Sequence, residues 1–203
     1  MYSSERAKTI VKKDVAHLSA GIEDNVMLTA VRFDKSINGN SFIEFKFEKE
    51  GKLLTHTEWE PSKRSDETEE SFQNKCDNQF SRIEQILKCY YPNAEDRKFI
   101  GENFTQFAQW VTEMLNKADL TTLLRVKIVY NNSGYTTLPK YAKYTFIEPM
   151  SLVNENKSVI VKLGIDQFEK PIVADLEKSN PSPFSMESSM DENNSADPNG
   201  LPF

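Results

Sequence analysis

The sequence predicts an α+β fold with a mainly β core, and three observations carry this prediction. Residues 26–59 contain β-rich and alternating runs separated by turn residues, and residues 65–117 repeat apolar side chains every three or four positions as helices do. Strand character then returns after Leu123. The 203 residues, 38% hydrophobic and 28% charged, suit one folded domain with a core of its own.

Three short strands are expected first. Residues 26–33 are rich in β-forming residues, and residues 41–48 alternate strictly between apolar and polar side chains. The turn formers Asn38-Gly39-Asn40 separate these two strands, and Glu50-Gly51 leads into a third strand over residues 53–59. This order predicts an antiparallel three-stranded meander.

A helical insert of two helices is expected over residues 65–117. Acidic residues in the first turns match the helix dipole, and apolar side chains recur along one face as far as Tyr90, before Pro92 ends the first helix. The second helix is predicted to begin near Ala94. The aromatic side chains of both helices are interpreted as core residues rather than as ligand contacts.

Two more strands are expected to complete the sheet, over residues 123–130 and residues 158–165. In the last strand every second residue is apolar and shares one face: Val159, Val161, Leu163 and Ile165. Three strands, helices and two further strands is the order of a five-stranded Greek-key barrel of the oligonucleotide-binding (OB) type. We therefore expect an OB-type domain over residues 21–172, with its helical insertion between strands 3 and 4.

Both ends of the chain differ from this domain. Residues 1–20 are expected to form a polar leader with a weakly helical, basic character. Residues 173–203 are expected to form a disordered acidic tail, because after Lys178 the chain has four carboxylates, no basic residue and little apolar area to bury. The tail ends in the apolar tip Leu201-Pro202-Phe203, which suits capture by a partner with an apolar pocket rimmed by Lys or Arg.

A basic, aromatic stretch over residues 125–146 indicates a nucleic-acid interface, because it holds four cations, five aromatic residues and no acidic residue. Cations track phosphates, and exposed rings stack unpaired bases at ~1–3 kcal/mol each. The predicted contacts are Arg125, Lys127, Tyr135, Lys140, Tyr141, Lys143 and Tyr144, with weaker candidates Arg32, Lys35, Phe42, Lys46 and Trp59 in the first sheet. The alternative is that the tyrosines pack on the barrel and Trp59 belongs to the core.

A strand-rich body, a basic aromatic stretch and an acidic terminus that closes in Pro202-Phe203 together resemble a bacteriophage single-stranded DNA-binding protein of the OB-fold type. The resemblance implies a non-enzymatic protein that coats and protects single strands in replication, recombination and repair. It also implies that the tail recruits a polymerase, primase or helicase through Asp191, Glu192, Asp197, Leu201, Pro202 and Phe203. The chain departs from the pattern in a larger helical insert and an acidic run diluted with Asn and Ser.

Two other classes remain open: a non-enzymatic adaptor that binds proteins, and a metal-dependent nuclease that uses the plentiful carboxylates. No cofactor or metal is expected, because the His and Cys residues lack paired zinc spacings and the glycines form no phosphate loop. Cys76 and Cys89 lie too far apart along one helix to bridge, which favours a reducing compartment. No apolar run reaches the ~20 residues that span a membrane, so a cytoplasmic location is expected, in the host cytoplasm for a phage protein.

Overall fold

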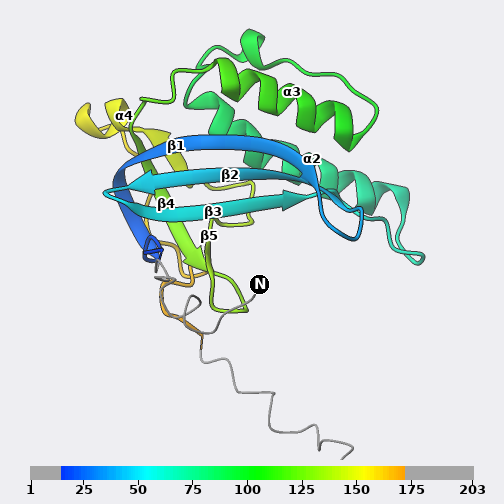
Figure 1. Ribbon diagram of the computed structural model, residues 1–203, viewed down its shortest axis with the longest axis horizontal. Coiled ribbons are helices and arrows are strands. Elements are labelled where there is room, and N and C mark those ends of the chain that lie inside the picture. The colour runs from blue at the N-terminus through cyan, green and yellow to red at the C-terminus, as the bar shows by residue number, and fades with distance from the viewer. Residues whose placement is uncertain (1–14, 172–203) are drawn as a thin grey trace, which may run out of the picture. The chain divides into compact units, whose positions relative to one another are not determined.

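The computed structural model describes residues 15–171, which form an antiparallel sheet of six strands and three α-helices (Figure 1). The strands are β1 (Gly21–Lys35), β2 (Ser41–Lys49), β3 (Lys52–Trp59), β4 (Leu124–Tyr130), β5 (Thr136–Thr137) and β6 (Ile147–Pro149). The helices are α2 (Glu69–Lys88), α3 (Phe104–Lys117) and α4 (Met150–Asn154), with a 3-10 turn, η1 (Ala94–Arg97), before α3. The strands run in the order β3-β2-β1-β4-β5, and β6 also pairs with β4. The helical insert lies between β3 and β4, as predicted.

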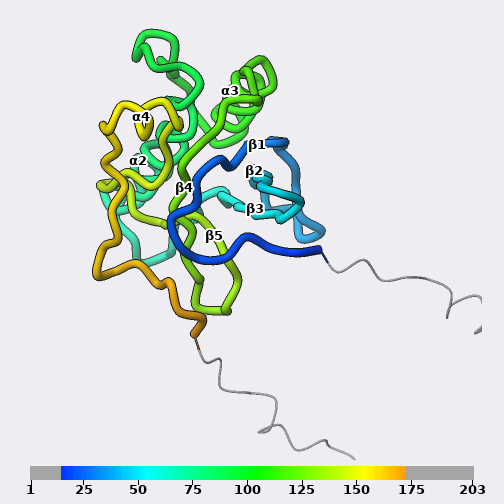
Figure 2. Tube along the Cα trace, turned by 90° about the vertical axis from the view of Figure 1, so that its left-hand side faces the viewer, coloured from blue at the N-terminus to red at the C-terminus, as the bar shows by residue number. Residues whose placement is uncertain are grey.

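The long strand β1 connects the two halves of the sheet. Its second half pairs with β2, its first half pairs with β4, and the register shifts between Leu28 and Ala30 and between Glu23 and Val26. Such irregularities bend a strand and increase its twist. Figure 2 shows the resulting curl of the sheet from β3 round to β5.

The core lies between the curved sheet and the two long helices, which lie together along one side of the sheet in Figure 1. The alternating apolar side chains of β2 are fully buried, and so are residues of both helices and of β4; examples are Phe45, Phe47, Leu87, Val111 and Val126. The aromatic rings of the helical insert stack on one another at centroid distances of 4.9–6.3 Å; they are Phe80, Phe99, Phe107 and Trp110. Phe107 is buried, and the other three pack against the core while keeping part of their surface exposed.

Local capping explains where the helices begin. The Thr68 hydroxyl accepts a hydrogen bond from the Ser71 amide at 3.2 Å and starts α2. The prediction that the second helix begins near Ala94 is wrong, because only the short η1 turn forms there. The helix α3 begins after Asn103, whose side-chain oxygen accepts a hydrogen bond from the Gln106 amide at 3.0 Å.

The predicted last strand over residues 158–165 is also wrong. The remaining strands of the sheet are the short β5 and β6, and residues 158–165 have no strand pairing. Two carboxylates hold this segment instead, since Glu148 accepts from the Val159 amide at 3.2 Å and Asp166 accepts from the Leu163 amide at 2.7 Å. The alternating residues Val159, Val161 and Ile165 are exposed, whereas Ile160 between them is buried.

Candidate nucleic-acid interface

Two aromatic rings and an arginine lie together on the outer face of β1, β2 and β3. The register of β2 and β3 places Phe42 beside Trp59, with ring centroids 5.0 Å apart, and the Arg32 guanidinium lies 5.4 Å from the centroid of the Phe42 ring. Phe42 is only 8% exposed, whereas Trp59 is 49% exposed. Arg32, Phe42 and Trp59, which we call the aromatic platform, therefore offer the indole as their accessible ring.

The charges around the platform nearly cancel. Arg32 donates to Glu44 at 2.8 Å and to Asp34 at 2.8 Å, and Lys46 lies 3.7 Å from Glu44. The hydrogen bond from Arg32 lowers the pKa of Glu44, so this carboxylate stays charged at neutral pH. Lys35 is exposed at the end of β1. The platform is thus better suited to stacking than to strong attraction of phosphates.

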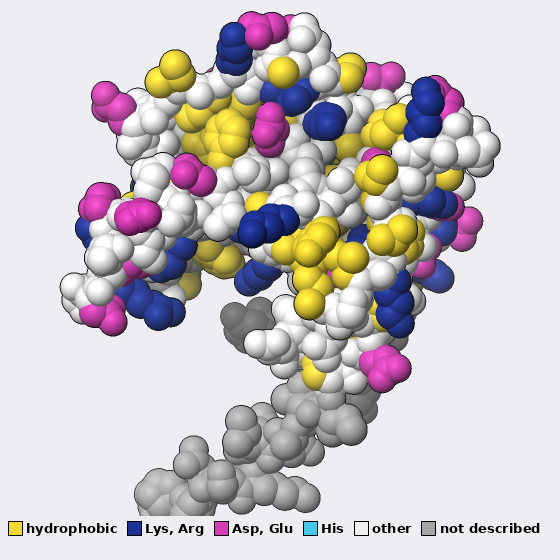
Figure 3. Space-filling view, turned by 180° about the vertical axis from the view of Figure 1, so that it is seen from behind, with side chains coloured by type: hydrophobic (Ala, Val, Ile, Leu, Met, Phe, Trp, Pro, Cys, Tyr) yellow, Lys and Arg dark blue, Asp and Glu magenta, His cyan; other side chains and the backbone are white. Residues whose placement is uncertain are grey.

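Cations without carboxylate partners lie instead in the loop of residues 138–146, which connects β5 to β6. Lys140 and Lys143 are exposed, and neither makes an ion pair with a carboxylate of residues 15–171. Tyr144 is 50% exposed, and its ring meets that of the half-buried Tyr141 edge-on at 5.5 Å. Figure 3 shows basic and apolar side chains together below the helical part of the molecule.

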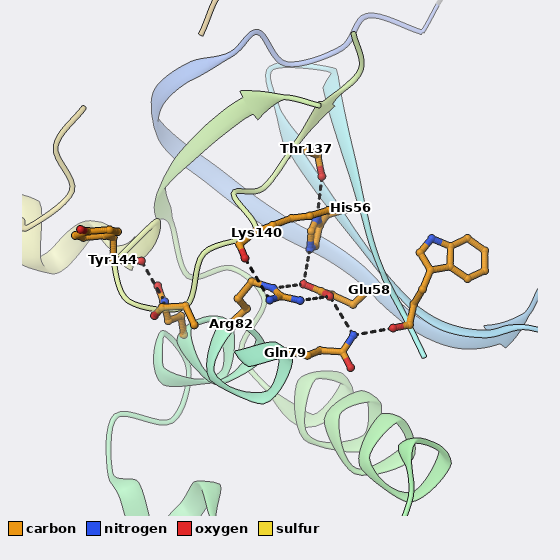
Figure 4. Close-up of polar contacts among 10 residues, drawn as sticks. His56, Glu58, Gln79, Arg82, Thr137, Lys140 and Tyr144 are labelled. Carbon is orange, nitrogen blue, oxygen red and sulfur yellow. Dashed lines mark hydrogen bonds and ion pairs between the residues drawn. The ribbon is translucent and has the colours of Figure 1, made fainter. Parts of the chain in front are cut away.

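Three side chains of α2 bind the backbone of both parts of the interface (Figure 4). Gln79 donates to the Trp59 carbonyl at 2.8 Å, and Arg82 donates to the Lys140 carbonyl at 3.3 Å. Gln85, on the same helix face, donates to two further carbonyls of the loop at 3.2 Å each. Because six residues of helix rise only ~9 Å, the end of β3 and the 138–146 loop lie side by side along α2.

A buried carboxylate organises this junction. Glu58 accepts hydrogen bonds from Arg82 at 2.7 and 2.8 Å and from Gln79 at 3.0 Å, and it lies 3.3 Å from Nε2 of His56. Burial raises the pKa of Glu58, but the hydrogen bonds from Arg82 and His56 outweigh burial and leave the pKa well below its usual range. Nδ1 of His56 is 2.9 Å from the hydroxyl of Thr137. The Glu58 network thus joins β3, α2 and β5.

Several side chains that were predicted to contact DNA bind other residues of the protein instead. Lys127 is 1% exposed and forms an ion pair with Asp166 at 2.8 Å, so it is not an accessible cation. Arg125 binds both carboxylate oxygens of Asp24, at 2.6 and 2.9 Å. The Tyr141 hydroxyl donates to Asp166 at 3.0 Å, and burial together with this hydrogen bond raises its pKa. Tyr135 is 72% exposed in the turn between β4 and β5. The structure therefore brings together only part of the predicted set.

No family model matches the chain, and neither a curated protein nor a solved structure is significantly similar to it. Within residues 15–171 no three His, Cys, Asp or Glu side chains converge as a metal site would require. None of the described helices combines the length and the apolar character that crossing a membrane would take. The tail residues predicted to bind partners lie outside the described part of the chain: Asp191, Glu192, Asp197, Leu201, Pro202 and Phe203.

Sequence reasoning missed the residues that join the two parts of the interface, namely Glu58, Gln79 and Arg82. One signal was available for Glu58, because in β3 it shares the inward phase with Leu54 and His56. Two ionisable or polar residues at inward positions of a strand need buried partners. The identity of those partners on α2 could not be read from the strand itself.

Proposed function

We propose that the protein binds single-stranded DNA across the aromatic platform and the adjacent 138–146 loop. The observation that carries the proposal is the half-exposed Trp59 indole, packed on Phe42 at the end of β3. The helix α2 joins the backbone at this end of β3 to a loop with two exposed lysines that pair with no carboxylate of residues 15–171. The ring face of an unpaired base is free to stack on a protein side chain, whereas in duplex DNA it is stacked on neighbouring bases. Base stacking on an aromatic side chain is worth ~1–3 kcal/mol. Lys140 and Lys143 would lie along the phosphates.

The strand order supports an OB-type barrel as the finer description of the fold. In that barrel the first strand takes part in both halves of the sheet, and nucleic acid crosses strands 2 and 3 between flanking loops. Here β1 pairs with both β2 and β4, and the platform lies on β2 and β3. The hydrogen-bonding contact between His56 and Thr137 brings the edge strands β3 and β5 together without a backbone ladder.

Replacing Trp59 by Ala is expected to weaken binding of a single-stranded oligonucleotide by about 5- to 150-fold, the equivalent of ~1–3 kcal/mol. Trp59→Phe keeps a ring and should retain most of the affinity. The measurement is a titration of each variant with single-stranded and duplex DNA of one sequence, read by mobility shift and by fluorescence anisotropy of the labelled DNA.

The control for Trp59 is Trp110→Phe, which alters the only other tryptophan, in the stacked helical cluster. It should leave DNA affinity unchanged. No preference for single strands, or equal affinity of wild type and Trp59→Ala, would refute the proposal. An adaptor would give no shift with either DNA, and a nuclease would cleave DNA when magnesium or manganese is added.

Removal of the two loop charges is expected to reduce the salt dependence of binding. Each phosphate neutralised on a single strand contributes about −0.7 to the slope of log affinity against log salt. The double variant Lys140→Gln and Lys143→Gln should therefore flatten the slope by about 1.4. Lys88→Gln with Lys117→Gln is the matched control, because both lysines are exposed at helix ends and neither belongs to the loop. Equal slopes for the two double variants would place the DNA elsewhere.

The acidic tail completes the proposal as the part that recruits replication proteins such as a polymerase, primase or helicase. Support comes from the sequence alone, in which the last residues combine carboxylates with the apolar tip Leu201-Pro202-Phe203. An apolar group on an anionic segment suits a pocket rimmed by Lys or Arg.

A further inference from the structure

A groove of about 670 Å³ lies between the first halves of α2 and α3 and the residues after β3. Its floor is aromatic and consists of Phe72, Phe80, Phe99, Phe104 and Phe107. In Figure 3 apolar side chains gather on the helical part of the molecule with acidic side chains around them. A groove of this size accepts several apolar side chains of a ligand.

The charged side chains at the rim of the groove are all acidic. Its acidic residues are Glu60, Glu69, Asp77 and Glu102, and no Lys or Arg lines the groove. Of these four, only Glu69 makes an ion pair with a cation of residues 15–171, namely Lys63. A cationic partner would therefore meet three rim carboxylates that carry no compensating cation from the described chain.

An apolar side chain at the rim is also left in solvent. Ile100 is 101% exposed, although it lines the groove beside Phe99. Its neighbour Gly101 lets the Phe99 ring approach closely, because a Cβ at this position would come within 2.3 Å of Cζ of that ring. The loop before α3 thus presents Ile100 outward while its backbone allows the aromatic floor to pack beneath it.

We propose that this groove is a docking site for a segment of a partner protein that presents apolar side chains flanked by Lys or Arg. The apolar side chains would enter between α2 and α3, as in helix-in-groove recognition, and the flanking cations would pair with the rim carboxylates. The same carboxylates repel phosphates, so nucleic acid is not the occupant. They also repel the chain's own acidic C-terminal segment, despite its apolar tip.

The probe is a fluorescent 14-residue peptide with Leu at helical spacing and Lys elsewhere, and the control peptide has Glu in place of Lys. The full-length protein should bind the Lys peptide and not the Glu peptide. Ile100→Ser should weaken binding several-fold, because it removes the apolar side chain that the rim offers to a ligand without adding a charge. Ile37→Ser is the matched control, because Ile37 is 102% exposed in the β1–β2 turn and does not line the groove.

A charge series tests the rim separately. Asp77→Asn with Glu102→Gln should weaken binding of the Lys peptide by several-fold and reduce its salt dependence. Glu113→Gln with Glu169→Gln removes two exposed carboxylates outside the groove and should have no such effect. Single-strand DNA binding should be unchanged in all groove variants, so this proposal and the proposed DNA interface can fail independently.

The proposal is overturned by no binding of the Lys peptide, by equal effects of Ile100→Ser and Ile37→Ser, or by equal effects of the two carboxylate pairs. The last two would mean nonspecific attraction to an acidic protein. A peptide of residues 1–14, with Ile10 and Val11 among basic residues, is the competitor. If it displaces the probe from the groove at lower concentration than unlabelled Lys peptide does, the occupant is this chain rather than a separate partner.

Discussion

Replacing Asp166 by Asn is expected to lower the free energy of unfolding by about 3–5 kcal/mol, the usual cost of removing one partner of a buried ion pair. The side chains of Lys127 and Asp166 are 1% and 0% exposed, and their charged atoms are 2.8 Å apart. The Asn variant leaves the Lys127 ammonium buried without a counter-ion. Urea unfolding followed by circular dichroism measures the loss.

The double variant Lys127→Met and Asp166→Asn isolates the charge effect. It removes the stranded ammonium and should recover a large part of the lost stability, because a buried ion pair can often be replaced by apolar groups at little cost. Glu155→Gln is the exposed control, since the Glu155 and Lys157 side chains are 55% and 68% exposed and such pairs contribute ~0–1 kcal/mol. A loss below about 1 kcal/mol in Asp166→Asn would contradict this account.

The partner of Lys127 in this ion pair also helps to position neighbouring residues. Asp166 also accepts from the Tyr141 hydroxyl and the Leu163 amide, and the Tyr130 amide donates to the carbonyl of Gln167 at 2.8 Å. Asp166 therefore helps to hold the end of the 158–167 segment against β4 and positions the Tyr141 ring beside Tyr144. A residue expected to contact DNA instead supports a neighbour of the proposed interface.

Local pattern was sufficient to predict the first half of the fold. The strict alternation in β2, the turn residues on both sides and the change to helical period after Ser65 are properties of neighbouring residues. The failure at residues 158–165 has a different cause. Alternation indicates which side chains share a face, but a strand also needs a partner backbone, and here that place is taken by the carboxylates of Glu148 and Asp166.

The candidate site was predictable where it depends on strand register. Counting from the Glu50-Gly51 turn pairs Phe42 with Trp59, so their contact follows from the meander. The positive charge of residues 125–146 was overestimated. The stretch itself contains no acidic residue, but acidic residues of other segments lie against it in the fold. Asp24 and Asp166 come from distant segments to neutralise Arg125 and Lys127. The charge of this stretch alone therefore predicted more exposed positive surface than the folded protein has.

Replacing Glu58 by Gln is the second change with a large expected effect, about 3–5 kcal/mol of unfolding free energy, because the Arg82 guanidinium loses its buried counter-ion. The folded-state pKa of Glu58 lies below its usual value of 4.5. The unfolded chain therefore binds the proton more readily, and the stabilisation is present above about pH 4.5 and lost as the pH falls through the lower folded value. Acid unfolding curves of wild type and Glu58→Gln should converge in that acidic range.

Glu44→Gln is the matched control for Glu58→Gln, since Glu44 also binds an arginine but on the outer face, where Arg32 is 52% exposed. It should cost no more than ~1 kcal/mol. Parallel acid unfolding curves for Glu58→Gln and wild type would show that Glu58 is not the titrating group that stabilises the junction.

Arg82 connects this stability effect to DNA binding. Arg82→Met removes the hydrogen bond to the Lys140 carbonyl as well as the pairing with Glu58, so the loop loses one of its attachments beside the platform. Single-strand affinity should fall below that of wild type at a temperature where both proteins are fully folded, although Arg82 lies behind the DNA face. The double variant Trp59→Ala with Arg82→Met should lose less binding free energy than the sum of the two single variants. The reason is that a correctly positioned loop improves binding only while the indole is present to stack. Additive losses would mean that platform and loop bind DNA independently.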